Sequence, residues 1–174
     1  DEEETKLAWK EVLKKTEGST ALVLSRQNLP HLEKCRGTKE FSRGGYVISH
    51  KEKEAPRVVL MASGSEVSIA VKINLTLKVS GITSRVVSIP DREEFLRQEK
   101  KYIEEVLGPK NALRVVIEAN TGQGWYQLLN DSYYTVFMKS FGKSALAQQL
   151  AECFGFTPEK IAQKIIKLCQ GTVL

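Results

Sequence analysis

The sequence contains little cysteine and little histidine, which limits the chemistry it can carry. The three cysteines, Cys35, Cys153 and Cys169, are odd in number and have no paired spacing. This argues against a disulfide framework or a zinc site and favours reduced thiols in a cytosol-like compartment. His31 and His50 lie in polar connecting segments, and no Ser-His-Asp or Cys-His order accompanies them. The sequence therefore provides no recognisable set of side chains for nucleophilic catalysis.

Clustered positive charge and long apolar runs are also missing. The net charge is +5, but lysine and arginine are mixed with acidic residues along the chain, whereas nucleic-acid-binding proteins gather cations on one face. No stretch has the pattern of a signal peptide, and no apolar run is long enough to cross a bilayer. We therefore expect neither a nucleic-acid partner nor membrane association. The first residue is Asp1 and not Met, so we expect the chain to be a processed or excised part of a longer protein.

A strand-helix-strand unit occupies the middle of the chain. The run Arg57–Ala62 is apolar and rich in β-branched residues, which is typical of a strand buried on both faces. Ser63 and Glu66 have the spacing of a capping box, in which each side chain would bond to the other residue's backbone amide. An amphipathic helix follows, and a second strand is expected at Ser84–Ile89. Two strands joined by a helix are expected to be parallel with a right-handed crossover, so the fold class is α/β.

The rest of the chain alternates between the same two patterns. We expect helices where apolar residues recur at helical spacing, and strands where short β-branched or aromatic runs occur. The expected helices are Thr5–Lys15, Asp91–Leu107, Ser144–Cys153 and Pro158–Cys169, and the expected strands are Thr20–Ser25, Tyr46–Ser49, Arg114–Ile117 and Tyr133–Phe137. The polar stretch from Arg26 to Arg43 is interpreted as a long loop between two domains.

Several short strings occur in the order and at the separations found in the C-terminal third of one enzyme family. They are Thr20–Pro30 (TALVLSRQNLP), Gly44–Val47 (GGYV), Ala62–Val67 (ASGSEV), Arg85–Pro90 (RVVSIP), Glu118-Ala119, Gly124-Trp125, Phe141-Gly142 and Phe154–Thr157 (FGFT). On these motifs the chain resembles the transketolases of the long bacterial, yeast and plant type. The resemblance covers the whole chain.

The resemblance implies a fold and a division into domains. Residues 45–174 would form the transketolase C-terminal domain, a three-layer α/β/α structure with a mostly parallel, about five-stranded sheet. Residues 1–44 would be the last helix, last strand and exit loop of the preceding α/β domain, which in the family binds the pyrimidine of thiamine diphosphate. The family's cofactor and metal motifs would lie upstream of Asp1. We therefore expect no catalytic, cofactor-binding or metal-binding residue in this chain.

The resemblance also implies an activity for the parent protein. Transketolases transfer a two-carbon ketol unit from a ketose phosphate to an aldose phosphate in the pentose phosphate pathway. They use thiamine diphosphate with Mg²⁺ or Ca²⁺ and act as homodimers. We expect the parent chain to do the same in the cytoplasm or a plastid, with its upstream domains as partners of this part. Alone, this chain is expected neither to bind thiamine diphosphate nor to transfer a ketol unit.

Arg26 is the residue for which we expect a binding role. It follows the predicted strand Thr20–Ser25, and ligands of open α/β sheets bind at the C-terminal ends of strands. A guanidinium matches a phosphate with two parallel hydrogen bonds. In transketolases the arginine of the LSRQ motif binds the phosphate of the sugar substrate, and it corresponds to Arg26. Most arginines at such positions form surface ion pairs, so the binding role depends on the motif.

Three other groups of residues have both a structural and a functional interpretation. The turn Ser63–Ser65 resembles a phosphate-binding loop, but it lacks the GxGxxG and Walker patterns, and Glu66 places a negative charge beside it. Glu118 stands alone at a strand end, where acids usually form caps or ion pairs. The lysines between Lys160 and Lys167 lie opposite apolar residues, as on a solvated helix face. We expect a structural role for all three groups.

Other functions agree with the same residues. Dihydroxyacetone synthase shares the transketolase motifs and differs in its acceptor sugar. A stand-alone, non-catalytic module could bind a nucleotide at Ser63–Ser65 or a partner protein, and an oligomerisation domain would need no small ligand. The sequence alone does not separate these functions from ketol transfer.

Overall fold

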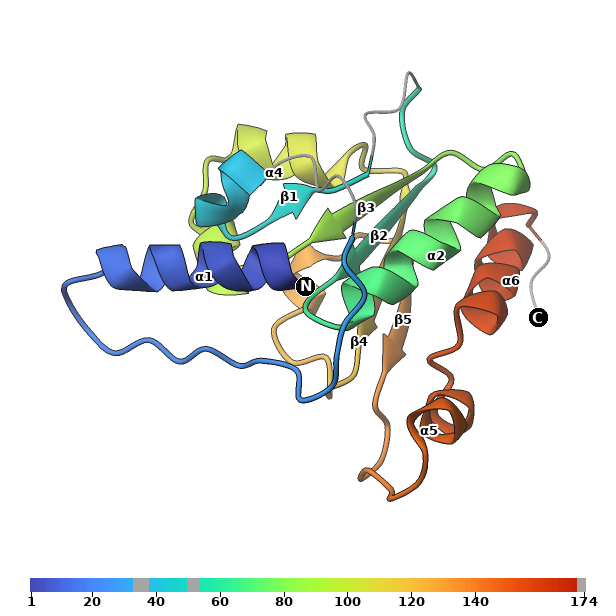
Figure 1. The fold of residues 1–174 in the computed structure, drawn as a ribbon. Coiled ribbons are helices and arrows are strands. Elements are labelled where there is room, and N and C mark those ends of the chain that lie inside the picture. Colours follow the sequence, from blue (N-terminus) through green and yellow to red (C-terminus); the bar gives the residue numbers. More distant parts are fainter. Residues whose placement is uncertain (33–37, 50–53, 172–174) are drawn as a thin grey trace.

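A computed structural model describes residues 1–32, 38–49 and 54–171; Cys35 and His50 lie outside these ranges. Figure 1 shows a central sheet with helices on both faces. In chain order the elements are α1 (Glu2–Lys14), the 3₁₀ turn η1 (Thr38–Arg43), β1 (Tyr46–Val47), β2 (Val58–Ala62), α2 (Glu66–Val79), β3 (Ser84–Ser88), α3 (Arg92–Leu96), α4 (Lys100–Leu107), β4 (Leu113–Glu118), the 3₁₀ turn η2 (Tyr126–Leu128), β5 (Tyr133–Phe137), α5 (Ala147–Phe154) and α6 (Pro158–Cys169).

The sheet has five strands in the order β1-β3-β2-β4-β5. β2 pairs parallel with β3 and with β4, and β4 pairs parallel with β5. Only the short edge strand β1 is antiparallel to its neighbour. The expected mostly parallel, five-stranded α/β sheet is therefore confirmed, with the predicted strand-helix-strand unit at its centre.

The sheet is buried because its strands are apolar on both faces. All five residues of β2 are 0% exposed. Val58, Leu60 and Ala62 belong to one hydrophobic cluster, while Val59 and Met61 belong to a second cluster on the opposite face. This alternation follows from the two-residue period of a strand. A central parallel strand needs helices on both sides.

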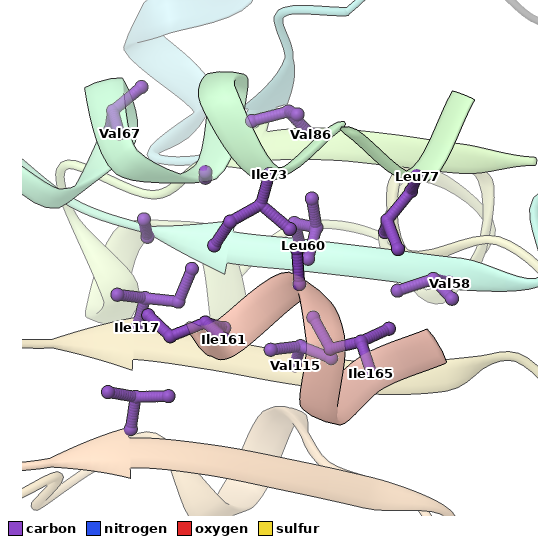
Figure 2. Packing of buried hydrophobic residues seen from close by; sticks show 14 of the residues in the cluster. Val58, Leu60, Val67, Ile73, Leu77, Val86, Val115, Ile117, Ile161 and Ile165 are labelled. Atoms are coloured by element: carbon purple, nitrogen blue, oxygen red, sulfur yellow. The ribbon is translucent and has the colours of Figure 1, made fainter. Parts of the chain in front are cut away.

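Helices cover both faces of the sheet. On the first, α2 and α6 run side by side over the sheet, and Figure 2 shows Ile73 of α2 above Leu60, with Ile161 and Ile165 of α6 beside strand β4. On the second face, residues of α3 and α4 and the buried Trp125 pack together. The result is the expected three-layer arrangement.

Gly44 allows the chain to pass close to the start of α3. Its φ is +80°, in the left-handed region that glycine adopts without strain. An added Cβ would lie 2.3 Å from the carbonyl oxygen of Asp91, and the Gly44 carbonyl accepts from the Asp91 amide at 3.1 Å. Gly44 of the GGYV motif therefore serves close backbone packing, and Gly45 makes room for the Phe95 ring, which would lie 2.8 Å from an added Cβ.

The predicted strand Thr20–Ser25 does not form in this structure. Residues 19–25 belong to no helix or strand, and Val23 and Leu24 are 95% and 54% exposed. A strand needs a neighbouring strand to satisfy its backbone groups, and the described residues provide none beside this segment. Helix α1, by contrast, agrees with the predicted helix over most of its length.

One predicted helix is wrong in its extent. The single helix expected at Asp91–Leu107 is two helices, α3 and α4, separated by residues 97–99, of which Glu99 is the non-helical N-cap of α4. The Gln98 side chain donates to the Glu94 carbonyl at 3.1 Å and so fixes the end of the first helix. Asp91 nevertheless caps α3 as expected, since its carboxylate accepts from the Glu94 amide at 3.0 Å.

The predicted capping box at Ser63 and Glu66 is also wrong. The N-cap of α2 is Ser65, without a side-chain cap hydrogen bond. The Ser63 hydroxyl instead donates to Oε2 of Glu118 at 3.0 Å, and the Ser65 hydroxyl donates to Oε1 of Glu66 at 2.8 Å. Carboxylates are strong acceptors, and the fold places Glu118 where Ser63 can reach it.

Candidate functional site

Arg26 lies in a long, mostly exposed segment, residues 15–32, that follows α1. The segment leaves the C-terminal end of α1, runs as an extended chain below the helix and returns toward the sheet (Figure 1). The Arg26 side chain is exposed, and within the described residues no ion pair to it is formed. Its guanidinium is therefore available to an anionic ligand.

A cavity of about 320 Å³ separates this segment from the body of the protein. Its walls come from four places: the first turns of α1, the segment itself, η1, and the loops at the carboxyl ends of β2 and β3. The residues that line it are Asp1, Glu4, Thr5, Ala8, Ala21, Leu22, Val23, Leu24, Ser25, Leu29, Phe41, Ser63, Gly64 and Pro90. The segment that carries Arg26 thus faces the carboxyl edge of the sheet, where ligands of α/β proteins bind.

Glu118 ends β4 at the same edge and joins three side chains there. Its Oε2 accepts from the Ser63 hydroxyl at 3.0 Å and from the indole N–H of Trp125 at 3.1 Å. Arg92 lies 3.9 Å from the same oxygen and over the Trp125 ring. These contacts connect the loop after β2 with the loop after β4, which supports the structural interpretation of Glu118.

Negative charge beside the turn Ser63–Ser65 argues against a phosphate site there. The Glu66 side chain is buried at the start of α2, and burial raises its pKa, with the charge of Glu118 adding to the effect. Hydrogen bonds from Ser65 and from backbone groups of Glu66 and Ala119 oppose that rise in pKa. An anion bound at this helix N-terminus would meet two carboxylates, whereas phosphate-binding turns present backbone amides and cations.

The lysines of α6 and the two described cysteines add no reactive site. Lys160 and Lys167 are exposed, as expected for a solvated face, while Lys164 is half-buried. Ile161 and Ile165 are buried as expected, whereas Leu168, expected on the buried side, is 39% exposed. Cys153 is exposed, and burial raises the pKa of the Cys169 thiol.

Two further observations limit what the described part of the chain can hold. Its His, Cys, Asp and Glu residues form no group of three that could bind a metal ion. None of its helices has the length and apolarity needed to span a membrane.

Two acids attach α1 to the rest of the protein, and the sequence patterns did not predict this role for them. Asp1 and Glu4 are each 9% exposed. Glu4 accepts from the hydroxyls of Tyr46 and Ser88, and Asp1 accepts from the Leu32 amide. In the sequence they are an Asp and a Glu three residues apart at the start of a helix, which is also the ordinary pattern of an N-cap.

Comparison with known proteins identifies the family. Residues 44–157 match the model of the transketolase-like TK C-terminal domain. Transketolase 1 of Pasteurella multocida is 39% identical over 167 residues, which are 94% of this chain and 25% of that protein. Transketolase of Aquifex aeolicus is 37% identical over 169 residues, 96% of this chain and 24% of the relative.

Solved structures agree with the sequence matches. The transketolase from Leishmania mexicana superimposes with a TM-score of 0.86 at 32% identity, over 99% of this chain and 24% of that one. A Pichia stipitis transketolase, solved as a complex with sedoheptulose-7-phosphate, superimposes with a TM-score of 0.83 at 33% identity. This match covers 96% of this chain and 24% of that one. The chain thus spans about a quarter of the length of these relatives. The five-stranded sheet, the family model and these relatives together show that the chain belongs to the transketolase family and contains its C-terminal domain.

Proposed function

We propose that this chain is the C-terminal part of a transketolase that transfers a two-carbon ketol unit from a ketose phosphate to an aldose phosphate. The observation that carries the proposal is the family match over 94% of the chain to a protein named transketolase. A related structure holds sedoheptulose-7-phosphate, which is a substrate of the proposed chemical class. A dihydroxyacetone synthase remains the alternative within the enzyme class, and it would differ in acceptor.

Within that enzyme, Arg26 binds the phosphate group of the sugar. Support comes from the exposed guanidinium, from its place in a segment that faces the carboxyl edge of the sheet, and from the LSRQ motif. An arginine remains charged at every physiological pH, so its role is recognition and orientation and not proton transfer. Two parallel hydrogen bonds would also fix the direction from which the sugar enters.

The cofactor and the metal bind elsewhere in the proposed enzyme. Among the described residues, His, Cys, Asp and Glu form no group of three that could bind a metal ion, and Glu66 and Glu118 oppose a diphosphate at the N-terminus of α2. We therefore assign thiamine diphosphate and Mg²⁺ or Ca²⁺ to upstream domains of the parent chain. Those domains are also the partners that would cover the exposed segment, in a homodimeric enzyme of the cytoplasm or a plastid.

Substitution of Arg26 in the full-length enzyme tests the proposed role. Arg26→Ala should raise KM for sugar phosphates and leave thiamine diphosphate affinity unchanged, with a cost in kcat/KM of about 2 kcal/mol, as for other charged hydrogen bonds. Arg26→Lys, which keeps the charge but loses the planar fork, should recover part of the loss. Lys15→Ala removes an exposed cation from the start of the same segment and is the matched control. An unchanged KM for Arg26→Ala would remove Arg26 from the site.

A further inference from the structure

Glu4 is a buried carboxylate that connects helix α1 to the sheet. It lies in the first turn of α1, where the helix dipole favours a negative charge. Its Oε1 accepts from the Tyr46 hydroxyl at 2.6 Å and from the Ser88 hydroxyl. Tyr46 belongs to β1 and Ser88 to β3, the two strands at one side of the sheet. A buried carboxylate is costly without such donors, so the three groups hold α1 at one position on the sheet.

Asp1 connects the same end of α1 to the far end of the segment that carries Arg26. Its Oδ1 caps the helix by accepting from the Glu4 amide at 3.2 Å, and its Oδ2 accepts from the Leu32 amide at 3.0 Å. Leu32 also packs against the hydrophobic cluster beneath α2. The segment is therefore attached at both ends to α1: covalently at Lys15, and through Asp1 at Leu32.

We propose that Glu4 is a positioning residue for substrate binding, which sets the place of Arg26 by fixing α1, and with it Asp1 and Leu32, on the sheet. This inference rests on the proposed phosphate-binding role of Arg26. Within this chain the segment has no helix or strand over residues 19–25, so its two attachment points determine where it runs. In the full-length enzyme Arg26 would lie between the strand expected at Thr20–Ser25 and the attachment at Leu32, so the Leu32 attachment still sets the position of the chain just after Arg26. Loss of the Glu4 contacts frees the α1 end and displaces Arg26 from the position at which it meets a phosphate.

The test measures kinetics of the full-length enzyme with two ketose donors, one phosphorylated and one without a phosphate. Glu4→Ala should raise KM for the phosphorylated donor about tenfold, comparable to losing one hydrogen bond to a charged group, and should leave kcat and KM for the other donor unchanged. In an Arg26→Ala background Glu4→Ala should raise KM no further, because residues that act through one contact are not additive. Glu11→Ala, another glutamate of α1 that pairs with Lys14, is the matched control.

A purely structural role of Glu4 gives different results. Equal losses with both donors, or a further tenfold rise in the Arg26→Ala background, would overturn the proposal. If Glu4→Ala does not fold, Tyr46→Phe replaces it, because it removes one donor and keeps the ring beside Phe41. The same KM pattern, smaller in size, is then expected, and its absence would count against the proposal.

Amide exchange of Leu32 separates the two proposals. Measured by NMR on the 174-residue chain, it should be faster in Glu4→Ala than in the wild type, because Asp1 no longer holds the Leu32 amide. Unchanged exchange at Leu32 would contradict the attachment itself. Faster exchange together with an unaffected KM in Arg26→Ala would leave the attachment intact but remove Arg26 from substrate binding, and the positioning role of Glu4 would fail with it.

Discussion

Two apolar runs of similar sequence lie in opposite environments in this protein. Val58–Ala62 (VVLMA) is the central strand of the sheet and is fully buried. Thr20–Ser25 (TALVLS) lies in an extended segment in which Val23 is 95% exposed. The first run has parallel neighbours on both sides and helices on both faces. The second has no neighbouring strand within the described residues. An apolar, β-branched run thus indicates that a segment can be a strand, and the partners decide whether it is one.

Truncating one apolar side chain in each run should give the largest difference in the free energy of unfolding. Leu60→Ala in β2 should lower the free energy of unfolding by about 3 kcal/mol, because it leaves a cavity among fully buried side chains. Val23→Ala should change it by less than about 0.5 kcal/mol, as other surface substitutions do. Urea unfolding of both variants of the 174-residue chain measures the two values. Similar losses in both would mean that the exposed segment is packed in solution.

Glu118 offers a second comparison, between a carboxylate that contacts three side chains in the interior and an exposed carboxylate in a surface ion pair with Arg97. Glu118→Ala would leave the Ser63 hydroxyl and the buried Trp125 indole without their acceptor, which should cost about 2 kcal/mol of unfolding free energy. Glu93→Ala removes an acid that is 87% exposed and should have little effect. Urea unfolding again supplies the measurement. A loss for Glu118→Ala no greater than that of the control would show that water replaces these bonds.

Glu66 predicts a dependence of stability on pH. Burial raises its pKa above 4.5, so the folded protein binds this proton more tightly than the unfolded chain does. Ionisation of Glu66 therefore lowers stability as the pH rises from about 4.5 through the raised value. Glu66→Gln removes this penalty, and its stability relative to the wild type should be more favourable at pH 7 than at pH 4. Equal differences at the two pH values would contradict the assignment; Glu159→Gln, in the exposed first turn of α6, is the control.

The smallest expected effect is the change in the NMR signals of the turn after β2, residues 63–65, when a nucleotide is added. Because Glu66 and Glu118 lie beside it, adding ATP should leave the NMR amide signals of Gly64–Val67 unchanged. A saturable shift of these signals would instead support the alternative of a nucleotide-binding module.

The sequence patterns predicted the central strands of the fold correctly. They did not predict hydrogen bonds between side chains that are far apart in the sequence. The parallel pairing of β2 and β3 follows from an apolar pattern within one strand-helix-strand unit. The capping box failed because Ser63 bonds to Glu118, which lies 55 positions away. Glu4 was missed for the same reason, since its donors Tyr46 and Ser88 are 42 and 84 positions distant. Arg26 was singled out by its motif and not by a local pattern.

Deuterium exchange over Thr20–Ser25 tests the central claim, that this chain is one part of a larger transketolase, most directly. In the 174-residue chain the backbone amides of this segment have no strand partner among the described residues, and they should exchange within seconds. In the full-length protein we expect them to be paired in the preceding domain and to exchange at least a hundredfold more slowly, since paired strands exchange only through opening. Fast exchange in the full-length protein, or slow exchange in the short chain, would contradict the account.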